Sequence, residues 1–374
     1  MLPAPTVRVG RMSSENPPPF ANRPRGAHFV RRAAVVVCLG LVALGALAVV
    51  QAMRPPELLE LGSRTVEIPA TIGLLGIARQ LAEQGVIRSQ IVFVGLTLSR
   101  GTARSLKAGE YEIPQGARLL TVLQLLETGR VKPHLLVLPE GFTIRDLARQ
   151  MEAEGIAPAA DVVRIATSPH LAWSLGIEAD SLEGYLFPDT YQVTKGMRVE
   201  EILGRMTQRF RDRVGTPDVV ARARERGLSL HQLITLASIV EKEAALASER
   251  PVIARVFLNR LRLDMPLQAD PTVAYAMAKE GRAPTRDDLL RDHPYNTYKN
   301  RGLPPGPIGN PGRSSVDAVL EPAHVPYLYF VAVDDRSHYF STTLEEHNRA
   351  VSRYRQYRRL RETSTLAPAN GRML

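Results

Sequence analysis

Two glutamates at the end of an apolar helical run are the residues of this chain whose type and spacing best suit proton transfer. The run Leu233–Val240 has apolar residues at intervals of three and four, which is typical of a buried helix face. Glu241 lies seven residues after Ile234 and four after Ala237, so it projects near this apolar seam. Glu243 lies roughly 200° further around a helix and is expected to face water.

A carboxylic acid at the position of Glu241 has two reasons to keep its proton. Partial burial disfavours the anion, and the negative end of the helix dipole adds to this effect if the helix stops soon after. Ser248–Pro251 predicts such a stop, because it is typical of an N-cap and first turn that open a second helix through Leu261. Glu241 is therefore a candidate general acid, and the alternative interpretation is a solvated or ion-paired helix glutamate.

The basic charge of the chain lies at its two ends. The formal net charge is +10 over 374 residues, but residues 1–32 hold six Arg against one Glu, and residues 349–374 hold seven Arg against one Glu. The body between them is nearly neutral, so a nucleic acid is not the expected partner. Residues 1–32 are rich in Pro and Arg without periodicity, and we expect them to be disordered.

A single apolar segment follows the N-terminal arginines. Ala33–Val50 is uncharged and continues to Met53, which at 1.5 Å per residue covers roughly 27–31 Å, enough for one bilayer crossing. The positive-inside rule predicts a cytoplasmic N-terminus. The alternative is a cleaved signal peptide, since Ala46–Ala48 is similar to a cleavage site. Cys38, the one cysteine of the chain, lies within this segment, which excludes an intrachain disulfide and thiol catalysis.

The region after the apolar segment alternates between short strands and helices. Residues 65–133 predict a strand-helix-helix-strand module with a terminating glycine at Gly85 and Gly129, and a similar unit begins again at Val137. Such units are too small to fold alone, so we expect α+β packing. The module resembles the LysM type of peptidoglycan-binding fold, although a generic α+β packing module would show the same alternation.

Several unusual strings surround the two glutamates. They are the aromatic turn Glu183–Tyr191, the polar segment Leu267–Tyr275, the segment Pro294–Tyr298 and the Pro-Gly loop Gly302–Gly312. Long loops of this kind inside a domain are usually functional or disordered, and the prolines favour a fixed cleft wall. Asp270 precedes a proline, so its first interpretation is an N-cap and its second a substrate contact.

The C-terminal part predicts a hairpin and no metal site. Tyr327–Val333 has the composition of a buried strand, and Arg336–Ser341 is its expected partner. His324, His338 and His347 lack the spacing of a strong metal motif, and the chain has no Gly-rich phosphate loop. No metal and no cofactor are expected.

Together, the run Ala237–Glu243 and the four strings closely resemble the YceG-like family of endolytic murein transglycosylases. The resemblance implies a LysM-like domain followed by a catalytic domain, both held at the inner membrane by one helix with the catalytic domain in the periplasm. It implies glycan strands of peptidoglycan as substrate and cell-wall synthases, the penicillin-binding proteins, as partners. It places the catalytic glutamate at Glu241. Our candidate substrate contacts are Tyr185, Tyr191, Gln268, Asp270, Asn296 and Tyr298.

The implied chemistry needs one acid. A lytic transglycosylase uses the C6 hydroxyl of the muramic acid as nucleophile and leaves a 1,6-anhydro end, whereas an ordinary glycosidase needs two carboxylates. Two alternatives stay open: a muramidase that hydrolyses the same bond, and a non-catalytic peptidoglycan-binding scaffold. The expected division is a cytoplasmic tail 1–32, a transmembrane helix 33–53, a linker 54–64, the LysM-like domain 65–133, the catalytic domain 134–362 and a disordered tail 363–374.

Overall fold

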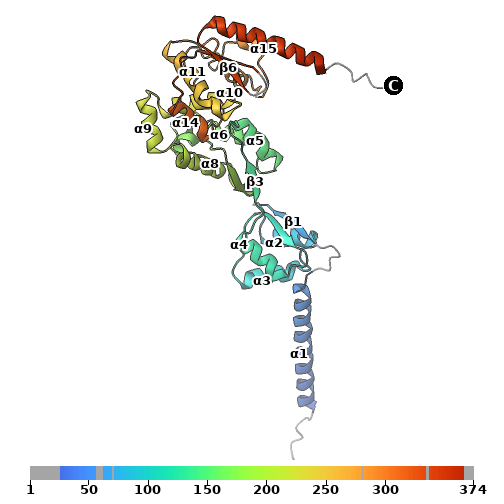
Figure 1. The fold of residues 1–374 in the computed structure, drawn as a ribbon. Coiled ribbons are helices and arrows are strands. Elements are labelled where there is room, and N and C mark those ends of the chain that lie inside the picture. The colour runs from blue at the N-terminus through green and yellow to red at the C-terminus, as the bar shows by residue number, and fades with distance from the viewer. Residues whose placement is uncertain (1–25, 56–61, 70, 280, 334–336, 366–374) are drawn as a thin grey trace, which may run out of the picture. The chain divides into compact units, whose positions relative to one another are not determined.

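The computed structural model describes residues 26–55, 62–69, 71–279, 281–333 and 337–365 (Figure 1). Their contacts divide the chain into two compact units. The N-terminal unit comprises residues 1–63, 73–105 and 113–127, and the C-terminal unit comprises residues 64–72, 106–112 and 128–374. The fold is mixed α+β, as expected.

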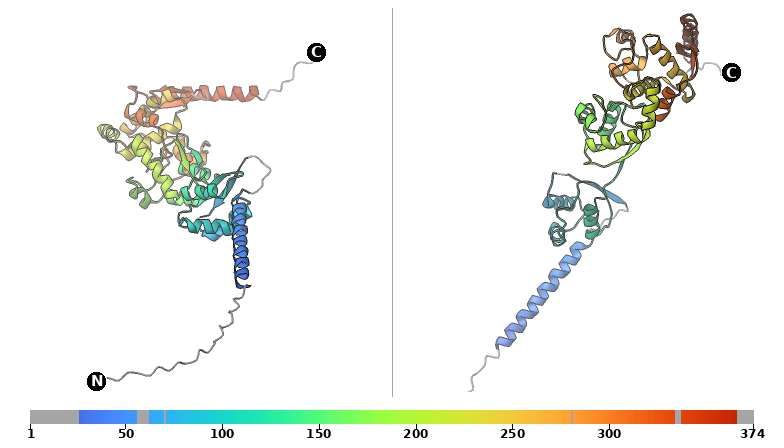
Figure 2. Two further views of the ribbon diagram at one scale, coloured as in Figure 1. Left: turned by 90° about the horizontal axis from the view of Figure 1, so that it is seen from below. Right: turned by 90° about the vertical axis from the view of Figure 1, so that its left-hand side faces the viewer.

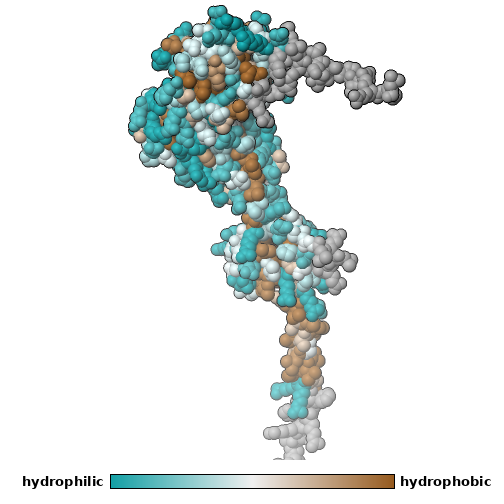
Figure 3. Space-filling view, in the orientation of Figure 1, coloured by the Kyte–Doolittle hydropathy of each residue, from teal (hydrophilic) through white to brown (hydrophobic). Residues whose placement is uncertain are grey.

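The first helix, α1 (Gly26–Met53), carries the apolar segment. Its part Val30–Met53 has a mean hydropathy of 2.8, and its side chains are mostly exposed, as the brown surface in Figure 3 shows. Among the described residues it is the one helix long and apolar enough to cross a membrane, which is consistent with a single-pass anchor; a signal sequence would pass the same test. Most of the expected disordered tail, residues 1–25, lies outside the described residues.

The region after α1 has the predicted order of strand, helix, helix and strand. β1 (Ser63–Ile68) pairs with β2 (Gly109–Pro114), and α2 (Leu74–Glu83) and α3 (Gln90–Ser99) lie between them in sequence. α4 (Leu119–Thr128) follows β2. Within the N-terminal unit α2 packs on α3, and Leu81, Phe93 and Leu126 are fully buried. Burial of these side chains stabilises three helices that are each too short to be stable alone.

The C-terminal unit is a helical body with two small antiparallel sheets. β3 (His134–Val137) pairs with β4 (Thr190–Val193), with Leu136 opposite Tyr191. The predicted hairpin is confirmed as β5 (Tyr329–Ala332) and β6 (His338–Ser341), in the register Phe330 opposite Phe340. The helices are α5 (Ile144–Ala153), α6 (Ala159–Ala166), α7 (Pro169–Ser174), α8 (Val199–Arg213), α9 (Pro217–Glu225), α10 (Leu230–Glu243), α11 (Arg250–Arg262), α12 (Asp270–Ala276), α13 (Arg286–Leu290), α14 (Arg313–Leu320) and α15 (Leu344–Thr365).

Helix α10 is the centre of this body. Every residue from Leu233 to Val240 is buried, and α10 packs against α9, α11, α12 and α14. The views in Figures 1 and 2 show α15 beside the hairpin β5–β6, with which it is in contact. Because α10 is covered on all sides, its apolar stripe is wider than the single seam that the spacing predicts.

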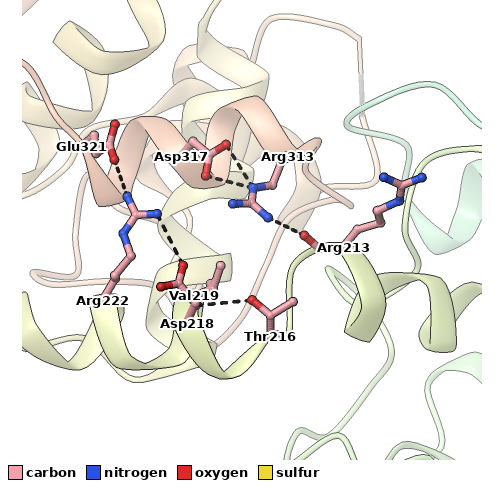
Figure 4. A network of polar contacts seen from close by, with 8 residues as sticks. All are labelled: Arg213, Thr216, Asp218, Val219, Arg222, Arg313, Asp317 and Glu321. Carbon is pink, nitrogen blue, oxygen red and sulfur yellow. Dashed lines mark hydrogen bonds and ion pairs between the residues drawn. The ribbon is translucent and has the colours of Figure 1, made fainter.

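Helix α14 is held against α8 and α9 by a polar network (Figure 4). Arg222 of α9 donates to Glu321 at 2.5 Å, just after the end of α14. Arg313, the first residue of α14, pairs with Asp317 at 2.9 Å and donates to the backbone oxygen of Arg213 at 2.6 Å. These contacts fix the start of α14, and therefore the end of the Pro-Gly loop that precedes it.

Candidate active site

The site is built at the C-terminal end of α10. A capping box between Ser229 and Gln232 starts this helix, and Ala244 ends it in an extended conformation. Glu241 and Glu243 thus both lie in the last turn, where the helix dipole disfavours a negative charge. The prediction that the helix stops directly after the glutamates is confirmed. The second helix is also present, but a short 3₁₀ turn, Ala247–Glu249, precedes it and Ser248 is not its N-cap.

Glu241 is engaged in a closed set of contacts. Its Oε1 lies 2.9 Å from a guanidinium nitrogen of Arg250, and its Oε2 accepts from the backbone N–H of Gly312 at 3.0 Å. The side chain of Glu241 is only 6% exposed and that of Arg250 15%. Glu140 approaches the same guanidinium at 3.4 Å, and burial together with the nearby Glu241 raises the pKa of Glu140. Glu241 is therefore ion-paired, as in the alternative interpretation of this residue as a solvated or ion-paired helix glutamate.

Glu243 lies in a different environment. It lines a cavity of about 340 Å³, whose described lining residues include no Glu241. Burial, and after it the negative charge of Asp270, raise the pKa of Glu243 to about 8, and Arg260 opposes the shift. The expectation that Glu243 faces water is wrong, because α12 and the Pro-Gly loop cover its side of the helix. The cavity is lined by Lys242, Glu243, Asp270, Pro271, Ala274, Tyr275, Gly281, Arg282, Ala283, Pro284 and Ile308.

Asp270 faces this cavity from the start of α12. It is the first residue of the helix, whose N-cap is Ala269, so the N-cap interpretation is wrong. Its carboxylate accepts a hydrogen bond from the hydroxyl of Tyr298 at 2.6 Å. Gln268, two residues earlier, is exposed with a φ of 50°, and its side-chain oxygen accepts from Arg260 at 3.3 Å. Three of the predicted contacts, Gln268, Asp270 and Tyr298, thus lie together at or next to the cavity.

The other three predicted contacts are bound within the fold. Asn296 is buried, donates to two backbone oxygens and accepts from the backbone N–H of Tyr298 at 3.0 Å. The hydroxyl of Tyr185 lies 2.7 Å from Nδ1 of His231, and that of Tyr191 donates to the backbone oxygen of Phe187 at 2.6 Å. None of the three is among the described residues that line the cavity. Their side-chain hydrogen bonds go to other parts of the fold.

The Pro-Gly loop forms one wall of the cavity. Residues 302–312 have no helix or strand, as expected, and Ile308 lines the cavity. The backbone N–H of Ile308 donates to Ser238 of α10 at 3.0 Å, and that of Asn310 donates to the backbone oxygen of Phe142 at 2.8 Å. The backbone oxygen of Pro305 lies 2.8 Å from Nε2 of His231, and the N–H of Gly312 donates to Glu241, so the loop is attached to α10 at three points.

Glu183 is a buried carboxylate that sequence reasoning did not single out. It accepts from the backbone N–H of Ile144 at 3.2 Å, from the side chain of Asn310 at 3.0 Å and from the hydroxyl of Tyr275 at 3.2 Å. Burial raises the pKa of Glu183 to about 7. It therefore joins the start of α5, the Pro-Gly loop and the cavity wall of α12. An acidic residue inside the apolar and aromatic string 182–187 is the signal that points to it.

The glycine beside Glu183 permits the loop to come this close. Gly184 has a φ of +88°, and a Cβ atom there would lie 2.4 Å from Cγ of Pro307. A larger residue would be strained in backbone conformation and would push the Pro-Gly loop away from α10.

No group of three or more His, Cys, Asp or Glu side chains that could hold a metal ion occurs in the described part of the chain. What the cavity offers instead is one carboxyl group that keeps its proton near neutral pH, a second carboxylate, and two cationic side chains, Lys242 and Arg282. This set suits acid catalysis on a polar substrate.

Comparison of the chain with known proteins shows to which family it belongs. The chain is 34% identical to the endolytic murein transglycosylase of Bacillus subtilis (strain 168) over 305 residues, which cover 77% of this chain and 84% of that one. It is 30% identical to the endolytic murein transglycosylase of Streptococcus pneumoniae serotype 2 (strain D39 / NCTC 7466), with 78% of this chain and 58% of that one covered. The crystal structure of a yceG-like protein of Listeria monocytogenes is similar with a TM-score of 0.53 and 36% identity, over 78% of this chain and 99% of that one. The family model of the YceG-like family matches residues 66–353, and the chain therefore belongs to this family.

Proposed function

We propose that this protein is a membrane-anchored lytic transglycosylase that cleaves the β-1,4 bond between MurNAc and GlcNAc inside peptidoglycan strands and leaves 1,6-anhydro-MurNAc ends. The names of its relatives in Bacillus subtilis and Streptococcus pneumoniae support the substrate and the class of reaction. The observation that carries the mechanism is the carboxyl group of Glu243, which lines the cavity and has a pKa of about 8.

The reaction divides into two proton transfers. The acid donates its proton to the glycosidic oxygen as the bond from this oxygen to C1 of MurNAc breaks. The C6 hydroxyl of the same MurNAc forms the new bond to C1, and its proton goes to the carboxylate just formed. The reacting hydroxyl belongs to the substrate, so holding the sugar in the right conformation supplies much of the rate.

Glu243 is our proposal for this acid, in place of the Glu241 of the sequence analysis. A general acid near neutral pH needs its proton and access to the substrate, and Glu243 has a raised pKa and lines the cavity. Glu241 is paired with Arg250 and holds the backbone of Gly312, so we assign it the positioning of the Pro-Gly loop. The original assignment to Glu241 is the alternative that the same variants test.

The remaining parts of the proposal concern the surroundings. Gln268, Asp270 and Tyr298 contact the glycan at the cavity, while Tyr185, Tyr191 and Asn296 support its walls. Residues 65–133 form a LysM-like module that binds peptidoglycan. α1 holds the protein in the inner membrane with its N-terminus in the cytoplasm, so that the catalytic domain 134–362 acts in the periplasm beside penicillin-binding proteins and ends glycan elongation.

A muramidase is the second candidate, and one observation favours it. Glu243 and Asp270 line the same cavity, and a hydrolase needs two carboxylates, one to protonate the leaving oxygen and one to activate water or attack C1. The two reactions differ only in the new sugar end.

Mass spectrometry of the cleaved strands separates the candidates. The full-length protein in detergent is incubated with un-cross-linked peptidoglycan strands, with Glu243→Gln as the inactive comparison. Internal products with 1,6-anhydro ends that disappear in the variant support the transglycosylase. Reducing ends would establish the muramidase. No cleavage by the intact protein would leave a peptidoglycan-binding scaffold of the synthesis machinery and overturn the proposal.

A further inference from the structure

We propose that Asp270 is the working partner of Glu243: its negative charge at the same cavity favours the proton-donating form of Glu243 and stabilises the positive charge that develops on the sugar. This inference rests on the proposed function and deepens it. A reaction that takes its nucleophile from the substrate needs no second carboxylate for proton transfer, so the presence of Asp270 in the cavity calls for a different role.

Several hydrogen bonds fix Asp270 and the segments next to it. Tyr298 donates its hydroxyl hydrogen to Asp270 at 2.6 Å, and the backbone N–H of Tyr298 is held by the buried Asn296 at 3.0 Å. The segment before Asp270 is fixed too. Arg260 donates to the backbone oxygen of Leu267 at 2.9 Å, and the backbone N–H of Ala269 donates to Thr297 at 3.0 Å. Asp270 is thus held in place at the cavity.

The charges around the two carboxyl groups divide their roles. Asp270 accepts a hydrogen bond from Tyr298 at the cavity. Glu243 is buried by its surroundings, and the charge of Asp270 raises the pKa of Glu243 while Arg260 of α11 opposes it. Among the described residues, Lys242 and Arg282 are the other charged side chains that line the cavity. Burial and the charge of Asp270 thus both favour the protonated form of Glu243.

This division of charge suits the transition state. As the glycosidic bond breaks, C1 and the ring oxygen of MurNAc become positive, and a carboxylate held in place by Tyr298 stabilises this charge. The proton of Glu243 goes to the leaving oxygen, and the proton of the C6 hydroxyl returns to Glu243. Asp270 gains and loses no proton, so the balance of the reaction is unchanged.

The first test is the pH profile of the full-length protein on un-cross-linked peptidoglycan strands. Asp270→Asn is expected to lower kcat by about 10²–10³-fold. It also moves the alkaline limb of kcat to lower pH by roughly one unit, since the like charge beside Glu243 is gone. A residue that only supported the fold would lower activity without moving this limb. Tyr298→Phe should lower kcat and move its alkaline limb to lower pH, each by less than Asp270→Asn does. Asp270→Glu should recover part of the kcat that Asp270→Asn loses.

Asp264→Asn is the matched control. Asp264 lies six residues before Asp270, carries the same charge and is exposed, with an ion pair to Arg301 at 2.5 Å. Its replacement removes one negative charge outside the cavity, so kcat and its pH profile should stay within about twofold of the unchanged protein. An equal shift of the alkaline limb in both variants would show a general effect of net charge and would overturn the proposal.

The second test needs no turnover. Glutamate labelled with ¹³C at Cδ lets the Glu243 carboxyl be titrated by NMR, with its signal identified by its loss in Glu243→Gln. Asp270→Asn should lower the pKa of Glu243, and Asp264→Asn should leave it in place. Coinciding titrations of Glu243 in Asp270→Asn and the unchanged protein would overturn the proposal whatever the protein does to glycan. A protein that shows this coupling but cleaves nothing would instead overturn the proposed function and, with it, the transition-state role.

Discussion

The two sides of the C-terminal turn of α10 hold identical side chains in different surroundings. On one side Glu241 is paired with Arg250 and accepts a hydrogen bond from the backbone N–H of Gly312. On the other side Glu243 lines a cavity, and burial with the nearby Asp270 raises its pKa to about 8. Both glutamates belong to the same turn of α10, so the local sequence does not distinguish them. The difference comes from what packs against each side, and it separates a positioning role from a chemical one.

The largest expected effect is on cleavage. Glu243→Gln should lower kcat by about 10²–10⁴-fold, because the neutral amide cannot donate a proton to the leaving oxygen. Glu241→Gln should lower kcat by less than about tenfold, because it keeps one hydrogen bond to the Pro-Gly loop. Both are measured as the rate of release of new glycan ends. The reverse ranking of the two variants would break the comparison and restore Glu241 as the acid.

The ion pair of Glu241 should be visible in stability. Arg250→Met leaves a carboxylate that is 6% exposed without its partner, which is expected to cost roughly 3 kcal/mol of unfolding free energy. Adding Glu241→Gln to Arg250→Met should recover part of this loss. Denaturant unfolding of the two single variants and the double variant measures the coupling. Additive effects would show that the two residues are not a working pair.

The hydrogen bond between Ile308 of the Pro-Gly loop and Ser238 of α10 can be tested separately from Glu241. Ser238→Ala removes the acceptor of the N–H of Ile308, a bond of 3.0 Å in the interior, and should cost about 1–3 kcal/mol of unfolding free energy. Since Ile308 also lines the cavity, KM should rise while the alkaline limb of kcat stays in place. A shift of that limb would mean that the loop, and not Asp270, controls the proton of Glu243.

The last effect is the pH dependence of stability. The pKa of Glu243 rises from an ordinary value of 4.5 to about 8, so between these pH values the folded protein keeps a proton that the unfolded chain releases. Stability is therefore lost as pH rises through this window. Glu183 has a pKa of about 7 and contributes with the same sign in every variant that keeps it.

Comparison with Glu243→Gln isolates the contribution of Glu243. The variant should gain stability relative to the unchanged protein as pH rises from about 5 to about 8, by up to about 4 kcal/mol, since each pKa unit corresponds to about 1.4 kcal/mol. Thermal unfolding at each pH measures the difference. A difference in stability between the two proteins that does not change with pH would show that the pKa of Glu243 is not raised.

Much of the framework follows from local patterns. The spacing of apolar residues predicts α10. The strand-like composition of Tyr327–Val333, followed by Arg336–Ser341, predicts the hairpin β5–β6. The prolines of residues 302–312 predict a loop without regular structure. The roles within the site follow less well. Asn296 and Tyr185 are in the predicted set, but their side chains bond inside the fold, because a motif shows that residues belong to a site and not which way they point.

The sequence by itself determined that two carboxyl groups stand at the end of a buried helix, beside an aromatic turn, a Pro-Gly loop and an apolar N-terminal segment. These features rest on interactions between residues near in the chain, which helix periodicity, turn chemistry and length express directly. Only the tertiary structure decided which carboxyl keeps its proton. Arg250, Gly312 and Asp270 reach the two glutamates from separate segments, and a pKa depends on the charges and the solvent that such distant segments bring together or exclude.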